Sequence, residues 1–144
     1  MLTLKHDQGF KTFIMKDGKK TFANEIAQNV FLRLSIHHAK KTNTWVPGSI
    51  LFNKAIENVQ PIFEIRKYRK GGTTQFLPVP CPLSRQRSLA FRWILEAARQ
   101  KKKIDLSFSL AQILYASFCR EGKVFQKRNE NHKLAEAHRM SIRG

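Results

Sequence analysis

The sequence predicts a mainly α-helical single domain of about six helices, with a two-stranded β-ribbon that protrudes between the third and fourth helices. Apolar residues recur at helical spacing through most of the chain. Residues 62–80 instead form two extended arms that meet at Gly71-Gly72, which is typical of a hairpin turn. With 144 residues, 42% of them hydrophobic, the chain can bury one core of ordinary size. We therefore assign residues 1–144 to one domain, with residues 62–80 as an extension.

The first helices are predicted from apolar periodicity. A short helix over residues 10–14 ends at Gly18, and a second helix begins at Lys19-Lys20 and ends near His37-His38. The expected buried face of the second helix consists of Phe22, Ile26, Val30 and Leu34, with Ala23, Ala27 and Phe31 beside them.

A third helix is expected after the turn pair Pro47-Gly48. Ser49 can cap its first turn, and Pro61 ends it. Its apolar side is predicted to contain Leu51, Phe52, Ala55, Ile56 and Val59. In the ribbon that follows, Pro78 and Pro80 cannot donate to a ladder, so the return arm is expected to be an edge strand, fully or only partly paired.

The fourth helix is predicted from Ser84 to Arg99, closed by Gln100 and the three lysines 101–103 as a cationic last turn. Three of its arginines are seven residues apart and share one side, namely Arg85, Arg92 and Arg99. The side expected to pack inward contains Ala90, Trp93, Ile94 and Ala97.

A fifth helix is expected to begin after a capping Asp105 and to stop at Gly122. Its apolar stripe consists of Leu106, Leu110, Ile113, Leu114 and Phe118. Residues 123–128 are predicted to be a basic connector, and a last helix contains Leu134 and Ala137.

The charge is the unusual property of this chain. Its 27 Lys and Arg residues outnumber 10 Asp and Glu residues, which gives a net charge of +17. Such an excess destabilises the compact state through self-repulsion, and a polyanion would relieve it. Nucleic acid is the leading partner, and an anionic membrane surface is the second choice. No apolar run approaches the roughly 18 residues of a membrane span, and the first residues lack the apolar core of a secretory signal.

No residue pattern indicates catalysis, a metal or a cofactor. The histidines have no zinc-ligand spacing with Cys81 or Cys119, and both cysteines are expected to be buried or inert thiols without a disulfide. A nuclease would need clustered carboxylates for metal ions, which this sequence lacks. The serines lie in no nucleophile elbow.

Several cationic clusters with few interspersed acids predict one phosphate-binding strip, although each run alone is also typical of a solvated face. Tyr68 and Phe76 beside it fit base stacking and core packing equally. The strip consists of Arg66, Lys67, Arg69, Lys70, Arg85, Arg87, Arg92, Arg99, Lys101, Lys102 and Lys103.

Five segments and His132 together resemble the small-subunit ribosomal protein seven family of bacteria and organelles. The segments are Met15–Lys20, Ala55–Pro61, Gly71–Thr74, Leu89–Arg99 and Lys127-Arg128. The resemblance implies a non-enzymatic protein that binds the 3′ domain of small-subunit ribosomal RNA, organises the subunit head and contacts neighbouring small-subunit proteins. It also implies that the ribbon tip lies near messenger and exit-site transfer RNA. Further RNA contacts implied by the resemblance are Lys16, Lys19, Lys20, Gly71, Gly72, Lys127, Arg128 and His132.

The chain departs from that family in a short arm before the first helix, in Gln75-Phe76 and Pro80 of the ribbon, and in residues 141–144. Contacts of those elements are therefore not carried over. A shortened, divergent chain without an import signal predicts an organelle-encoded protein of the mitochondrial ribosome, with a plastid or the bacterial cytoplasm as alternatives. The competing interpretation is a free-standing basic helical regulator that binds nucleic acid.

Overall fold

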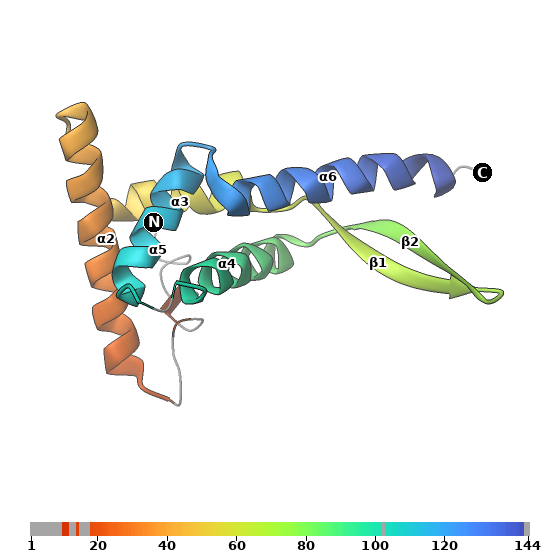
Figure 1. Ribbon diagram of the computed structural model, residues 1–144, viewed down its shortest axis with the longest axis horizontal. Helices are drawn as coiled ribbons and strands as arrows, with labels where there is room; N and C mark the ends of the chain where they lie inside the picture. The colour runs from red at the N-terminus through yellow and green to blue at the C-terminus, as the bar shows by residue number, and fades with distance from the viewer. Residues whose placement is uncertain (1–9, 12–13, 15–17, 102, 143–144) are drawn as a thin grey trace.

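A computed structural model describes residues 10–11, 14, 18–101 and 103–142. Helices α2 (Lys20–Thr42), α3 (Gly48–Val59), α4 (Leu83–Arg99) and α5 (Leu106–Phe118) form the helical body. Strands β1 (Phe63–Lys70) and β2 (Thr73–Pro80) form the ribbon, and α6 (Gly122–Ile142) is the last element of the chain. Figure 1 shows the ribbon and α6 extending from the body toward the same side. The predicted class, a mainly helical domain with a protruding ribbon, is confirmed.

Helix α2 follows the predicted periodicity but differs at two points. Its buried residues are Ala23, Ile26, Ala27, Val30 and Leu34. Phe22 is 61% exposed, so its inclusion in the buried face was wrong. The helix also continues past His37-His38 to Thr42, where Asn43 adopts a left-handed conformation (φ 56°) and donates its N–H to the Ala39 carbonyl at 2.9 Å. That bond satisfies a carbonyl at the helix end.

Helix α3 buries all five residues that were predicted for its apolar side. Its start is different from the prediction, because Pro47 occupies the N-cap position and Ser49 lies inside the first turn without capping it. Gly48 is buried where α3 meets α2, and a Cβ at this position would collide with the backbone carbonyl of Phe31. The glycine therefore permits the close approach of the two helices.

The core lies between helices α2 to α5 and also takes in Phe10. The ring of Phe10 is 4.7 Å from that of Phe52 and 5.9 Å from that of Phe91, centroid to centroid. Phe52 and Phe91 stack at 6.1 Å. Phe10, Lys11 and Ile14 are helical, and the rest of the expected first helix lies outside the described residues.

The ribbon is an antiparallel pair in full register, from Lys70 opposite Thr73 to Phe63 opposite Pro80. Gly71 and Gly72 have positive φ angles of 59° and 82°, as a two-residue hairpin turn of this kind requires. Counting from the turn, both prolines fall at non-hydrogen-bonded pairs, where a missing N–H removes no ladder bond. The return arm is therefore fully paired despite its prolines.

Helix α4 begins at Leu83 after Pro82, one residue before the predicted start, and ends at Arg99. Lys101 and Lys103 follow the helix instead of forming its last turn. Of the residues predicted to pack inward, Ala90 and Ile94 are fully buried, while Trp93 and Ala97 pack against the core and are partly buried. The buried face is wider than predicted and also includes Leu89, Phe91, Leu95 and Ala98.

Two predictions about the last third were wrong in detail. Asp105 holds the N-cap position of α5, but its carboxylate accepts a hydrogen bond from the Ser107 hydroxyl at 2.6 Å and caps no backbone N–H. Residues 123–128 are helical and belong to α6, which begins at Gly122 (φ 91°). Four of these six residues, namely Lys123, Gln126, Lys127 and Arg128, are good helix formers, and Val124 packs against the core with 5% of its surface exposed, so the segment folds as helix.

Within the described part of the chain, none of the helices is long and apolar enough to cross a membrane. Cys81 is buried and Cys119 is exposed, and both are free thiols.

Candidate nucleic-acid interface

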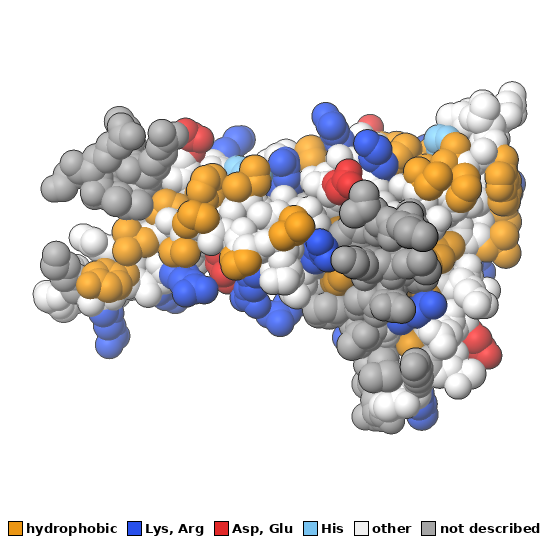
Figure 2. Space-filling model, turned by 180° about the vertical axis from the view of Figure 1, so that it is seen from behind, with side chains coloured by type: hydrophobic (Ala, Val, Ile, Leu, Met, Phe, Trp, Pro, Cys, Tyr) orange, Lys and Arg blue, Asp and Glu red, His pale blue; other side chains and the backbone are white. Residues whose placement is uncertain are grey.

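The ribbon presents cations on both of its faces. Arg66, Lys67 and Arg69 are exposed on β1, and successive residues of a strand point to opposite faces. Strand β2 has no charged residue, so the positive charge lies along one strand. The turn residues Gly71 and Gly72 are exposed at the tip. Figure 2 shows Lys and Arg side chains along the ribbon and across the helical body, with few acidic side chains among them.

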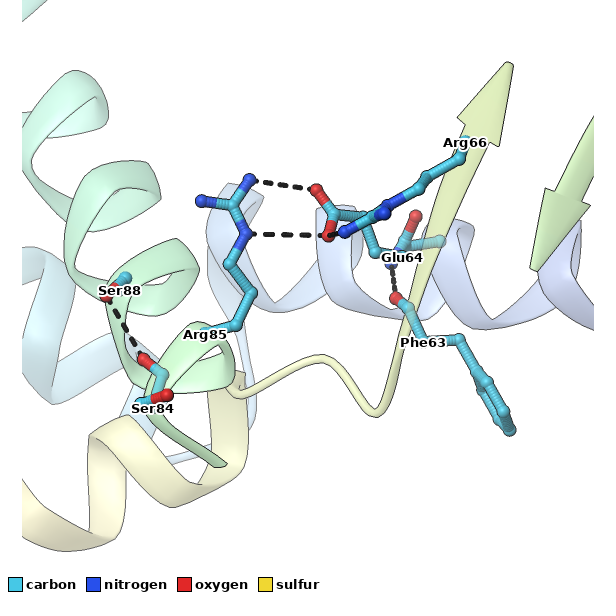
Figure 3. A network of polar contacts seen from close by, with 7 residues as sticks. Phe63, Glu64, Arg66, Ser84, Arg85 and Ser88 are labelled. Carbon is cyan, nitrogen blue, oxygen red and sulfur yellow. Dashed lines mark hydrogen bonds and ion pairs between the residues drawn. The ribbon is translucent and has the colours of Figure 1, made fainter. Parts of the chain in front are cut away.

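An ion pair connects the base of the ribbon to α4 (Figure 3). The Arg85 guanidinium donates to both carboxylate oxygens of Glu64, with Nη2–Oε1 at 2.9 Å and Nε–Oε2 at 3.4 Å. Arg66 lies farther away, with its Nη2 at 4.0 Å from Glu64 Oε2. The hydrogen bond from Arg85 lowers the pKa of the Glu64 carboxyl. Arg85, predicted as a phosphate contact, therefore has a protein partner that fixes its direction.

The other predicted arginines of α4 differ in exposure. Arg92 and Arg99 are exposed and lie seven residues apart on one side of the helix. Arg87 is partly buried, and its Nε has no hydrogen-bond partner among the described residues. The side chains of Arg92 and Arg99 are thus open to a phosphate backbone, whereas Arg87 is partly enclosed by protein.

The remaining predicted lysines lie at helix ends or outside the described residues. Lys19, Lys101 and Lys103 are exposed. Lys101 Nζ is 3.4 Å from Gln112 Oε1, to which it donates. Lys16 and Lys102 lie outside the described residues, and so do the side chains of Lys20 and Lys70.

Helix α6 holds three predicted contacts in three different environments. Lys127 is exposed, with its Nζ 5.1 Å from the centre of the Trp93 ring, a cation–π distance. Arg128 Nε is 3.4 Å from the Gln60 carbonyl oxygen, to which it donates. His132 Nε2 accepts the backbone N–H of Ile62 at 3.1 Å. Arg128 and His132 therefore contact the protein backbone at the root of the ribbon.

Burial changes the acid–base chemistry of these two groups. It lowers the pKa of Arg128, with a further contribution from Arg120. Burial also lowers the pKa of His132, and the positive charge of Arg128 lowers it further. His132 must be neutral in this arrangement because its Nε2 acts as an acceptor.

Sequence reasoning missed residues of two kinds. Glu64 and Asn131 hold the ribbon root, and no local pattern marks them because their partners are distant in the sequence. On α2, Arg33 and Lys40 are exposed and seven residues apart, so the spacing that identified the α4 arginines would also have found them. They line a groove of about 250 Å³ with Phe108, whose ring centre is 5.5 Å from the Arg33 guanidinium.

The fold and its surface define a class of small, basic, mainly helical proteins with a cationic ribbon arm. The chain belongs to the ribosomal protein S7p/S5e family, whose sequence model matches residues 7–139. This confirms the resemblance to the seventh small-subunit ribosomal protein.

Relatives named small ribosomal subunit protein uS7 occur in several bacteria. The protein of Nautilia profundicola is 37% identical over 126 residues, which cover 88% of this chain and 77% of the relative. The Thermotoga maritima protein is 38% identical over 126 residues, which again cover 88% of this chain and 77% of the relative. The Campylobacter concisus protein is 37% identical over 130 residues, 90% of this chain and 80% of the relative. These bacterial relatives do not support a mitochondrial assignment, which stays a prediction.

Proposed function

We propose that this chain is a structural component of the small ribosomal subunit that binds the 3′ domain of small-subunit ribosomal RNA and organises the subunit head. Membership of the S7p/S5e family carries the proposal, and the net charge of +17 agrees with it. Neighbouring small-subunit proteins are further partners. The exposed ribbon tip at Gly71-Gly72 lies near messenger and exit-site transfer RNA in this proposal.

The proposed mechanism is electrostatic and requires no catalytic residue or cofactor. Exposed Arg and Lys side chains of the ribbon and of α4 neutralise phosphates of converging RNA helices and release their counterions. A ribbon with cations on both faces can contact two RNA segments at once. RNA shape and single-stranded junctions, more than duplex base edges, supply the specificity.

The decisive variants are Arg92→Ala and Arg99→Ala, because both side chains are exposed. Each should weaken binding to a transcript of the 3′ domain at fixed salt and leave circular dichroism unchanged. The matched control is Lys54→Ala, which removes an exposed cation from α3, outside the proposed strip. Equal effects of all three variants would mean that total charge, and not this surface, determines binding.

The free-standing regulator gives a different result in two assays. It predicts tighter binding to duplex DNA than to the RNA transcript, and no sedimentation of the tagged chain with small ribosomal subunits. Fractionation of the source cells before sedimentation tests the separate prediction of a mitochondrial ribosome against a plastid or bacterial one.

A further inference from the structure

Three neighbouring side chains of α6 hold the short linker between α3 and β1 together with the first residue of β1. Arg128 donates to the Gln60 carbonyl at 3.4 Å, and Asn131 Nδ2 donates to the Phe63 carbonyl at 2.6 Å. His132 accepts the N–H of Ile62 at 3.1 Å. Residues 128, 131 and 132 have i, i+3 and i+4 spacing, so they lie on one face of the helix. We refer to Arg128, Asn131 and His132 as the ribbon-root clamp.

The clamp binds a backbone N–H that would otherwise donate to the opposite strand of the ribbon. The strand register ends with Phe63 opposite Pro80, and one step beyond it the Cys81 N–H donates to the Ile62 carbonyl at 3.0 Å. The reciprocal partners are diverted, because the Ile62 N–H goes to His132 and the Cys81 carbonyl accepts from Gln86 Nε2 at 3.0 Å. The strands therefore do not form the second hydrogen bond between Ile62 and Cys81, and the two groups bind side chains of α6 and α4 instead.

We propose that Arg128, Asn131 and His132 are positioning residues, which set the direction of the ribbon and affect RNA binding through it without contacting RNA themselves. The inference rests on the proposed RNA-binding function. A two-stranded ribbon has little stability of its own, so its direction depends on its attachments. The clamp attaches the root of the ribbon to α6, and the Glu64–Arg85 pair attaches it to α4. A misdirected ribbon could not contact RNA together with the helical body.

The acceptor role of His132 gives the proposal a distinctive pH dependence. Among the described side chains of α6, Arg128 and Glu136 are the charged groups near the His132 imidazole, and His132 and Glu136 line one groove of about 450 Å³. On the ribbon side, the groove is lined by side chains that do not titrate: Ile62, Phe63, Pro78 and Pro80. The one acidic residue of β1 is Glu64, whose carboxylate is paired with Arg85. Protonation of His132 removes the acceptor and opens the clamp.

The two possible roles of His132 predict opposite responses to acid. If His132 positions the ribbon, binding of the 3′-domain transcript weakens as the pH falls below 6.5, the ordinary imidazole pKa, because burial and Arg128 lower the pKa of His132. If it contacts phosphate, protonation strengthens binding over the same range. The variant His132→Gln keeps an acceptor that does not titrate, so the difference between its pH profile and that of the wild type isolates His132 from the other histidines.

A charge-adding variant separates the roles at neutral pH. His132→Lys adds a cation but has no acceptor, so we expect about a two- to tenfold loss of RNA affinity, the value of one hydrogen bond. Increased affinity would overturn the proposal. Lys133→Ala changes an exposed neighbour on α6 and should have the pH profile of the wild type. Circular dichroism confirms that each variant is folded.

A measurement without RNA distinguishes failure of this inference from failure of the proposed function. Spin labels on the exposed Cys119 and on Thr74→Cys near the ribbon tip report the direction of the ribbon by electron–electron distance. We expect one narrow distance distribution for the intact clamp and a broader one for Asn131→Ala and His132→Lys. Identical distributions would overturn the inference. Failure of the wild-type chain to bind RNA, with a clamp-dependent distribution, would contradict the proposed function alone.

Discussion

Replacing Gly48 with alanine tests the packing that leads the chain into the ribbon. Gly48 begins α3, and a Cβ at this position would meet the carbonyl carbon, oxygen and Cα of Phe31 in α2. Backbone atoms cannot rotate away as a flexible side chain could, so the helices must separate. We expect Gly48→Ala to destabilise the chain by about 1–3 kcal/mol, the usual cost of overpacking.

The sign of this effect is diagnostic. In a helix without such a contact, alanine is more stable than glycine by roughly 0.5–1 kcal/mol. Urea unfolding followed by circular dichroism measures the difference, with Ser49→Ala as the control on the next residue of α3. Because Ser49 caps no backbone group, its replacement should change the free energy of unfolding by less than about 0.5 kcal/mol. A Gly48→Ala variant as stable as the wild type would refute the close approach of α2 and α3.

Two further variants and one chemical modification test the core, the ion pair and the thiols. Phe52 is 1% exposed and contacts the Phe10 ring, so Phe52→Ala should lower the free energy of unfolding by about 3–5 kcal/mol in urea. The Arg85 hydrogen bond lowers the pKa of Glu64, so the stability that this ion pair supplies is fully present above pH 4.5 and is lost as the pH falls through the pKa of the folded state. In Glu64→Gln, the midpoint urea concentration of unfolding should no longer show this acid dependence. An aromatic disulfide reagent should modify Cys119 rapidly and Cys81 only on unfolding, because burial raises the pKa of Cys81.

The parts of the fold that were predictable have local signals. The apolar stripe of α3 follows the helical period, and all five of its residues are buried. Gly71-Gly72 marked the turn because two residues with positive φ favour glycine. The sequence predicts a connector at residues 123–128 because four polar or charged side chains obscure the helical period, and only the packing of Val124 on the core reveals the helix.

The candidate site was less predictable because its geometry is tertiary. Exposed cations such as Arg92 can be found from charge and spacing alone. The partners of Arg128 and His132 lie 68 and 70 residues away, so nothing in their local sequence separates a positioning residue from a phosphate contact. Arg85 has the same difficulty, since its pairing with Glu64 depends on how the ribbon meets α4.

The salt dependence of RNA binding by the wild-type chain tests the central claim most directly. If exposed cations bind the 3′-domain transcript by neutralising phosphates, the logarithm of the association constant should fall linearly with the logarithm of salt concentration, by about 0.7 to 0.9 per phosphate contacted. A slope corresponding to several phosphates is the expected result. A flat response, or no binding near physiological ionic strength, would contradict the account.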